Sequence, residues 1–110
     1  MLDSKRRSSQ IKQRIRSIQA ELANLGPMRP GCLSLQYRNP KEKTGPNYQL
    51  SYTHQMKSRT DYIPADLVPQ IQQEVDEYKR FRELTTEWVA LSIEWSRLKI
   101  KLSRAANDSK

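Results

Sequence analysis

Residues 84–102, LTTEWVALSIEWSRLKIKL, carry the pattern that decides the fold. Their apolar side chains recur at spacings of three and four, the period of one face of an α-helix. The same spacing extends back to Ile71, so the pattern predicts a long helix over residues 66–103. The seam residues expected to pack against another helix are Trp88, Leu91, Trp95 and Leu98.

A second apolar set lies beside this seam, at Val89, Ile93 and Ile100. It widens the apolar face of the long helix beyond what one partner helix covers. We therefore expect a further helix on this face, supplied by a second copy of the chain.

The N-terminal part of the chain predicts a shorter helix over residues 4–25. Its apolar residues follow a heptad pattern, which is typical of a helix that packs against another helix. Gly26 and Pro27 end it, because proline cannot continue the helical hydrogen bonds. The packing residues of this helix are Ile11, Ile15, Ile18 and Leu22.

Between the two helices, glycine and proline residues indicate a loop over residues 26–47, within which residues 32–37 could form a short extended or helical piece. Residues 48–63 then alternate apolar and polar side chains, which predicts a β-hairpin with its turn at residues 54–56. A lone hairpin is marginal in water, so we expect one face to lie against the helices or a partner chain.

These elements fit a single domain of 110 residues, of which 35% are hydrophobic. That is too little apolar mass for a thick globular core. The predicted fold class is α+β and mostly helical. We expect an antiparallel two-helix coiled-coil hairpin with a β-hairpin in the connection, which dimerises through the long helix and ends in a flexible tail at residues 104–110.

Positive charge is concentrated in the first part of the chain. The sequence has 20 Lys and Arg residues against 12 Asp and Glu residues, a net charge of +8. Residues 1–60 hold twelve basic and three acidic residues, net +9, whereas the remainder nets −1. This asymmetry favours a polyanionic partner, and we expect nucleic acid, either DNA or RNA.

The candidate contacts come from the first helix, the loop and the hairpin. On the hairpin, aromatic stacking and phosphate contacts could come from one ribbon. The alternative for its two tyrosines, Tyr48 and Tyr52, is packing against the helices. The candidate nucleic-acid-binding residues are Arg6, Arg7, Lys12, Arg14, Arg16, Lys41, Lys43, Tyr48, Tyr52, His54, Lys57 and Arg59.

The sequence offers little for catalysis or metal binding. The single histidine, His54, has no obvious Cys or Ser partner, and the single cysteine, Cys32, cannot form a multi-thiolate site. We therefore expect a protein that is not an enzyme and that needs no cofactor or metal. No apolar run approaches the roughly 18 residues of a membrane span, so we expect a cytoplasmic protein that does not enter the membrane.

Residues 45–54, GPNYQLSYTH, and residues 57–60, KSRT, carry a resemblance to a known family. Together with residues 15–28 and 78–84, they resemble an uncharacterised prokaryotic domain-of-unknown-function family of small basic proteins. The resemblance covers about residues 11–102. Members of this family often occur near mobile elements, so the resemblance implies a mobile-element context.

The chain departs from the family pattern at two places. Family members often carry several cysteines between the positions of Tyr37 and Gly45, which suggests a zinc knuckle, but residues 38–44 contain no cysteine. Met56 stands where the family usually has glycine, an exchange that disfavours a tight primed turn.

The residues and the resemblance together predict a non-catalytic nucleic-acid-binding protein. It would serve as a small regulator or accessory subunit of a larger nucleoprotein enzyme of a mobile element, with the first helix and the hairpin holding phosphates. The alternative is a helical protein-interaction module, such as an adaptor, inhibitor or chaperone-like clamp, whose basic face meets an acidic partner protein.

Overall fold

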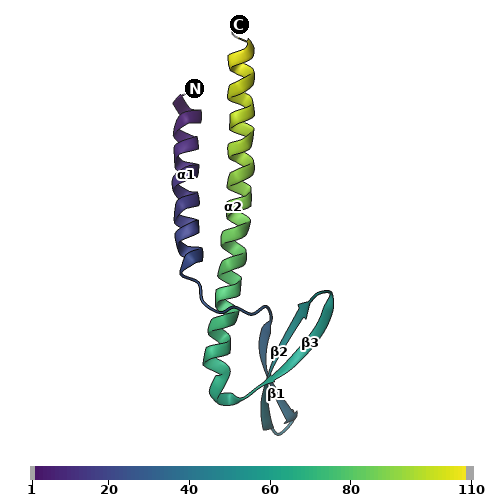
Figure 1. Ribbon diagram of the computed structural model, residues 1–110. Helices are drawn as coiled ribbons and strands as arrows, with labels where there is room; N and C mark the ends of the chain where they lie inside the picture. Colours follow the sequence, from purple (N-terminus) through teal and green to yellow (C-terminus); the bar gives the residue numbers. More distant parts are fainter. Residues whose placement is uncertain (1, 109–110) are drawn as a thin grey trace. The chain divides into compact units, whose positions relative to one another are not determined.

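The computed structural model describes residues 2–108, which form helices at both ends and a sheet between them (Figure 1). This arrangement confirms the α+β class. The coiled coil and the dimer stay predictions. The elements are α1 (Leu2–Ala23), β1 (Cys32–Asn39), β2 (Thr44–His54), β3 (Lys57–Ile63), the short 3-10 helix η1 (Ala65–Leu67) and α2 (Val68–Asp108).

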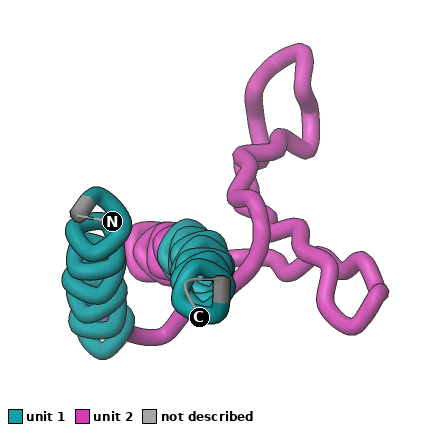
Figure 2. Tube along the Cα trace, turned by 90° about the horizontal axis from the view of Figure 1, so that it is seen from above, with its two compact units in different colours: residues 1–24, 81–110 teal, residues 25–80 magenta. Residues whose placement is uncertain are grey.

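The chain divides into two compact units (Figure 2). Unit 1 comprises Met1–Asn24 and Phe81–Lys110, and unit 2 comprises Leu25–Arg80. Helix α2 contributes its first turns to unit 2 and its remainder to unit 1.

Unit 1 is an antiparallel pair formed by α1 and the later part of α2 (Figure 1). Arg7, early in α1, binds Glu94, whereas Arg14 binds the earlier Glu87, so the two helices run in opposite directions. The buried side chains of this unit are Ile11, Ile18 and Leu84. The other expected packing residues, which are half-buried, are Ile15, Leu22, Trp88, Leu91, Trp95 and Leu98.

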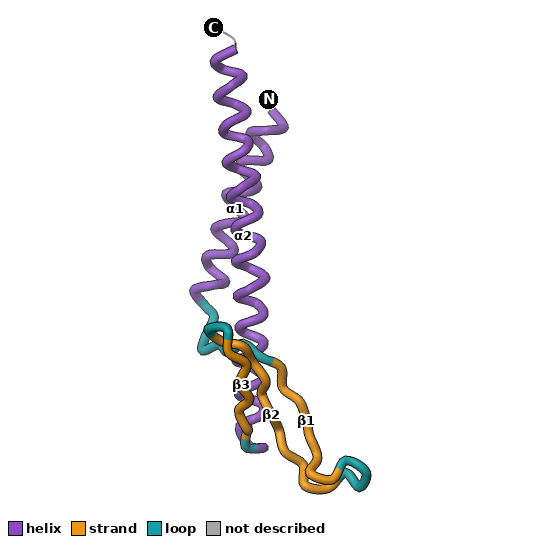
Figure 3. The backbone as a smooth tube through the Cα atoms, turned by 90° about the vertical axis from the view of Figure 1, so that its right-hand side faces the viewer, coloured by secondary structure: helices purple, strands orange, loops and turns teal. Residues whose placement is uncertain are grey.

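Unit 2 contains an antiparallel sheet in the order β1-β2-β3, with the start of α2 packed on one face (Figure 3). Its core joins Leu50 of β2, Ile63 of β3 and Val75 of α2. The sheet therefore buries one face against a helix, as the marginal stability of a lone hairpin requires. Partly buried residues packed against this core are Leu33, Tyr48, Tyr52, Val68 and Ile71.

A continuous loop over residues 26–47 is wrong, because β1 forms within it and β2 already begins at Thr44, whereas the extended alternative for residues 32–37 is confirmed. The glycines and prolines lie mostly at the ends of the strands. Pro46 lies inside β2, but β3 pairs with β2 only from Tyr48 onwards. Pro46 therefore occupies a stretch where β2 has a neighbour on one side only, a place where a missing amide hydrogen is tolerated.

The turn between β2 and β3 is tight, contrary to the expectation from Met56. His54 pairs with Lys57, so only Gln55 and Met56 connect the strands, and both have positive φ angles, of 51° and 64°. Positive φ at both central residues is the mark of a primed turn, which matches the twist of the flanking strands. The turn forms because its geometry suits the sheet, although neither residue is a glycine.

The C-terminal tail is also shorter than expected. Helix α2 continues to Asp108, so residues 104–108 are helical, and the remaining residues of the expected tail, 109–110, lie outside the described residues. Within residues 2–108, neither helix holds an apolar stretch long enough to cross a membrane.

Candidate nucleic-acid interface

Two of the candidate arginines on α1 bind acidic residues of α2. Arg7 donates two hydrogen bonds to Glu94, from Nε to Oε2 at 2.5 Å and from Nη2 to Oε1 at 2.8 Å. Arg14 binds Glu87 in the same way, at 2.6 Å and 2.8 Å. Paired bonds of this kind fix the geometry of both partners. Arg7 and Arg14 therefore hold the helices of unit 1 together.

The hydrogen bonds shift the pKa values of these groups. The bonds from Arg7 lower the pKa of Glu94 below its ordinary value, assisted by the nearby positive charge and opposed by desolvation. The bonds to Glu94 and Glu87 likewise raise the pKa values of Arg7 and Arg14. The Glu94 carboxylate is therefore charged at neutral pH and neutralises Arg7.

Elsewhere in unit 1, two lysines lie against the ring of Trp95 and a third lines the same hollow. The Lys12 Nζ lies 5.2 Å from the ring centroid, and the Lys99 Nζ lies 4.4 Å from it. At these distances the aromatic ring attracts each ammonium group. The third lysine, Lys5, joins them around a hollow of about 430 Å³. The full lining is Lys5, Ser8, Ser9, Lys12, Trp95, Lys99 and Leu102.

This lysine hollow has the chemistry of an anion site. Within residues 2–108, none of Lys5, Lys12 and Lys99 forms an ion pair, so their charges are not neutralised by the fold. The hydroxyl groups of Ser8 and Ser9 add neutral donors beside them. Ammonium groups suit phosphate as compact point charges, without the fixed geometry that a guanidinium requires.

Of the lysines in this hollow, only Lys12 was among the sequence candidates. Lys5 shares a face of α1 with Lys12, seven residues later, and this spacing is visible in the sequence. Lys99 and Trp95 join them only through the antiparallel pairing of α1 with α2. Trp95 was expected to be a packing residue, and its ring also holds the two ammonium groups.

The two units differ less in charge than the two parts of the sequence do, and both units are positive. Unit 1 contains twelve Lys and Arg residues against six Asp and Glu residues, net +6, whereas unit 2 has eight against six, net +2. Most of the net positive charge therefore lies in the helix pair. Its remaining candidates, Arg6 and Arg16, are exposed on α1.

On the sheet, the guanidinium group of Arg29 lies over the ring of Tyr52. The Arg29 Cζ lies 4.7 Å from the centroid of the Tyr52 ring, and its Nη2 donates to Asp61 Oδ2 at 2.7 Å. The bond to Asp61 raises the pKa of Arg29. The Arg29 backbone amide also donates to the Glu74 carbonyl oxygen at 3.0 Å. Arg29 thus ties the sheet to α2 within unit 2.

The tyrosines and the basic residues of the hairpin differ in their surroundings. Tyr48 and Tyr52 are partly buried and pack against the core of unit 2. This is the packing role that the sequence offered as the alternative to base stacking. His54, Lys57 and Arg59 are exposed near the β2–β3 turn.

The basic residues of the sheet do not form one group. Lys41 and Lys43 lie in the β1–β2 connection, at the opposite end of β2 from Lys57. Because β2 has eleven residues, at about 3.4 Å each, roughly 34 Å separates its two ends. The basic charges of the sheet are therefore divided between its ends.

Within residues 2–108, no group of three His, Cys, Asp or Glu side chains could hold a metal ion. Cys32 lies exposed as a free thiol at the start of β1.

Comparison with known protein families gives a match over much of the chain. The model of a family described as a domain of unknown function, DUF6788, matches residues 8–73, more than half of the chain. This confirms a resemblance to a family of unknown function and leaves the prokaryotic origin and the mobile-element context as predictions. No curated protein and no solved structure matches the chain.

Proposed function

The chain belongs to the DUF6788 family, and from its own charges and contacts we propose that it is a non-catalytic nucleic-acid-binding protein. The observation that carries this proposal is the convergence of Lys5, Lys12 and Lys99 on one hollow in the more basic unit. The phosphate backbone supplies most of the affinity in such binding, and lysines serve it without reading a base sequence.

A polymer fits this surface better than a small anion, because the basic residues continue along α1. Arg16 follows Lys12 by four residues and extends the face that begins at Lys5. At 1.5 Å per residue, the stretch from Lys5 to Arg16 covers about 16 Å. A nucleic-acid strand carries one phosphate per roughly 3.4 Å of helix axis, so several phosphates could lie along this face.

The ion pairs of unit 1 support the same assignment. Glu87 and Glu94 are bound to Arg14 and Arg7, so these carboxylates do not repel a phosphate as unpaired charges would. In this proposal Arg7 and Arg14 position the helices, whereas the lysine hollow contacts the ligand. The hairpin residues His54, Lys57 and Arg59 would add a second, weaker contact.

The test compares two triple variants that have the same net charge. One, Lys5→Gln/Lys12→Gln/Lys99→Gln, neutralises the lysine hollow; the other, Lys41→Gln/Lys43→Gln/Lys79→Gln, removes three exposed charges from unit 2. Binding of labelled 20-nucleotide DNA and RNA is measured between 50 and 200 mM salt. We expect the hollow variant to lose at least tenfold in affinity at 50 mM salt. Its salt slope should fall by about 2 to 3, since each phosphate contact contributes about 0.7–0.9.

Equal losses in the two variants would show that net charge alone drives binding and would contradict the site. Failure of the wild-type chain to bind either nucleic acid at 50 mM salt would contradict the function itself. A Lys5→Arg/Lys12→Arg/Lys99→Arg variant retains the charge and should bind like wild type. Circular dichroism of each variant verifies that the helices are retained.

Two finer elements complete the proposal. The seams of α1 and α2 would pack as an antiparallel coiled coil, which is supported by their heptad spacing and by the burial of Ile11 and Ile18. The small size and the lack of a catalytic constellation in the described residues suit an accessory subunit of a larger nucleoprotein complex. The mobile-element context is supported only by the resemblance of the sequence.

A further inference from the structure

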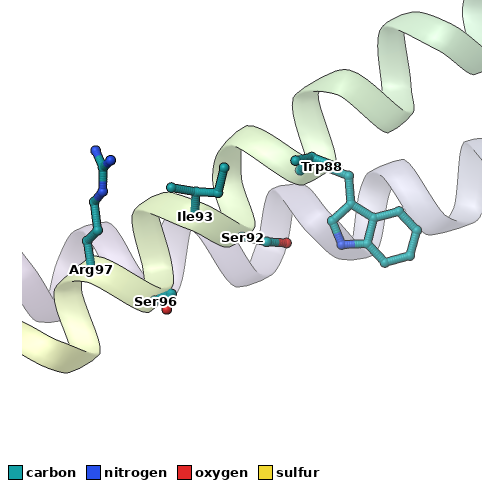
Figure 4. Close-up of a pocket in the computed structure, with 6 residues that line it drawn as sticks. Trp88, Ser92, Ile93, Ser96 and Arg97 are labelled. Atoms are coloured by element: carbon teal, nitrogen blue, oxygen red, sulfur yellow. The ribbon is translucent and has the colours of Figure 1, made fainter.

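Helix α2 carries an apolar hollow that the nucleic-acid proposal does not use. It has a volume of about 510 Å³ and lies along residues 88–97. Figure 4 shows Trp88 at one end and Arg97 at the other, with Ser92, Ile93 and Ser96 between them. The sixth lining residue is Val89.

A second hollow continues the first along the same helix. It has a volume of about 450 Å³ and begins at Ser96, which lines both hollows. Its other lining residues are Lys99, Ile100, Ser103 and Arg104. We call the two together the α2 groove. From Trp88 to Arg104 it follows about 24 Å of helix, or between four and five turns.

The floor of the groove has the spacing of a helix-packing seam. Val89, Ile93, Ser96, Ile100 and Ser103 follow one another at intervals of four, three, four and three residues. Yet Val89, Ile93 and Ile100 are 60%, 49% and 50% exposed. The serines between them are small enough for another helix to approach closely. A second helix could therefore bury this seam as α1 buries the first.

The edges of the groove are basic. Arg97 and Arg104 line it, together with Lys99, which also lines the lysine hollow. The acidic residues nearest to it in sequence, Glu87 and Glu94, bind Arg14 and Arg7 on α1. A partner is therefore met by apolar side chains flanked by positive charge.

We propose that the α2 groove binds an acidic amphipathic helix of another protein. Charge complementarity favours this partner over the second copy expected from the sequence. A parallel copy would bring Arg97 and Arg104 against the same arginines. An antiparallel copy centred on Ser96 would bring Arg104 near Glu87 and Arg97 near Glu94, and these glutamates are already bound to Arg14 and Arg7. An acidic helix supplies both an apolar seam and unpaired carboxylates along the whole groove. This site goes beyond the proposed nucleic-acid function and does not depend on it.

The probe is a designed 18-residue peptide with leucines at heptad spacing and glutamates beside them. Its binding to the full chain is followed by fluorescence anisotropy at 150 mM salt. We expect saturable binding that falls at least tenfold in the Ile93→Gln variant. Binding should fall similarly in Arg97→Gln/Arg104→Gln, which removes two positive charges from the edges of the groove. The matched control is Met56→Gln, which replaces a fully exposed apolar residue in unit 2 and should bind like wild type.

Two further peptides separate the contributions. A peptide with the leucines scrambled retains its charge, and one with lysines in place of glutamates retains its seam; both should bind at least tenfold more weakly. Equal binding of the scrambled peptide, or an unchanged affinity in Ile93→Gln, would overturn the proposal. So would sedimentation of a wild-type dimer that Ile93→Gln dissociates, because a second copy would then fill the groove. Nucleic-acid binding by Ile93→Gln should stay within twofold of wild type, so the two proposals can fail separately.

Discussion

At the residue scale, the β2–β3 turn holds two residues in a strained backbone conformation, which the pairing of β2 with β3 stabilises. Met56 has a φ of 64° and Gln55 a φ of 51°. This left-handed conformation costs an ordinary residue about 1–2 kcal/mol, whereas glycine adopts it freely. The Met56 side chain is 97% exposed, so it contributes little packing that could compensate.

Met56→Gly should therefore stabilise the protein. We expect the free energy of unfolding to rise by about 0.5–1 kcal/mol, because relief of the strain exceeds the greater freedom that glycine gives the unfolded chain. Urea denaturation followed by circular dichroism measures it. Met56→Ala removes the same side chain but retains the strain, so it should stay close to wild type. A gain in Met56→Ala equal to that in Met56→Gly would contradict the explanation.

At the element scale, the pairing of α1 with α2 depends on pH through Glu94. The bonds from Arg7 lower the pKa of Glu94 in the folded chain, so the carboxylate binds fewer protons there than in the unfolded chain. Its contribution to stability is complete above the unfolded pKa, about 4.3, and is lost as the pH falls through the lower folded value.

Glu94→Gln should consequently lower the melting temperature more at pH 7 than at about pH 3. Thermal unfolding of both proteins across this range measures the difference, which should shrink steadily below about pH 4.3. The matched control is Glu42→Gln, an exposed residue that forms no ion pair within residues 2–108. A difference that persisted unchanged to pH 3 would show that the charge of Glu94 does not stabilise the helix pair.

The elements also show what the sequence could predict. The periodicity of apolar residues predicted both helices. A helix that buries one face carries apolar residues on that face at each turn or two, as at the buried Ile11 and Ile18. Strand β1 was predicted only as one alternative, an extended piece at residues 32–37, although Leu33, Leu35 and Tyr37 alternate with polar residues, since the prolines and glycines around it resemble a loop.

The lysine hollow was predicted only in part. It needs Lys99 of α2 beside Lys12 of α1, and that juxtaposition depends on the register of two helices. Local spacing within one element does not fix such a register. The ion pairs of Arg7 and Arg14 depend on the same register, so local spacing does not separate these two arginines from the other basic residues of the first helix.

At the scale of the whole molecule, the two units share the backbone of α2 but have separate buried clusters. Unit 2 is built around Leu50, Ile63 and Val75, whereas unit 1 buries Ile18 and other residues of α1 and α2. A break in a helix at one point costs only the hydrogen bonds of about one turn. The units can therefore open separately, and their local stabilities should respond to different mutations.

Leu50→Ala should destabilise unit 2 selectively. Leu50 is fully buried, and truncation of a buried leucine costs about 2–5 kcal/mol. Because about 1.4 kcal/mol corresponds to a factor of ten, amide hydrogen exchange in residues 25–80 should accelerate by roughly 30-fold or more. Exchange in residues 2–24 and 81–108 should change much less. Ile18→Ala, which truncates a fully buried residue of unit 1, should give the reverse pattern.

Equal acceleration in both units for either variant would mean that α2 couples them into one cooperative structure. Peptide-resolved mass spectrometry distinguishes the two outcomes.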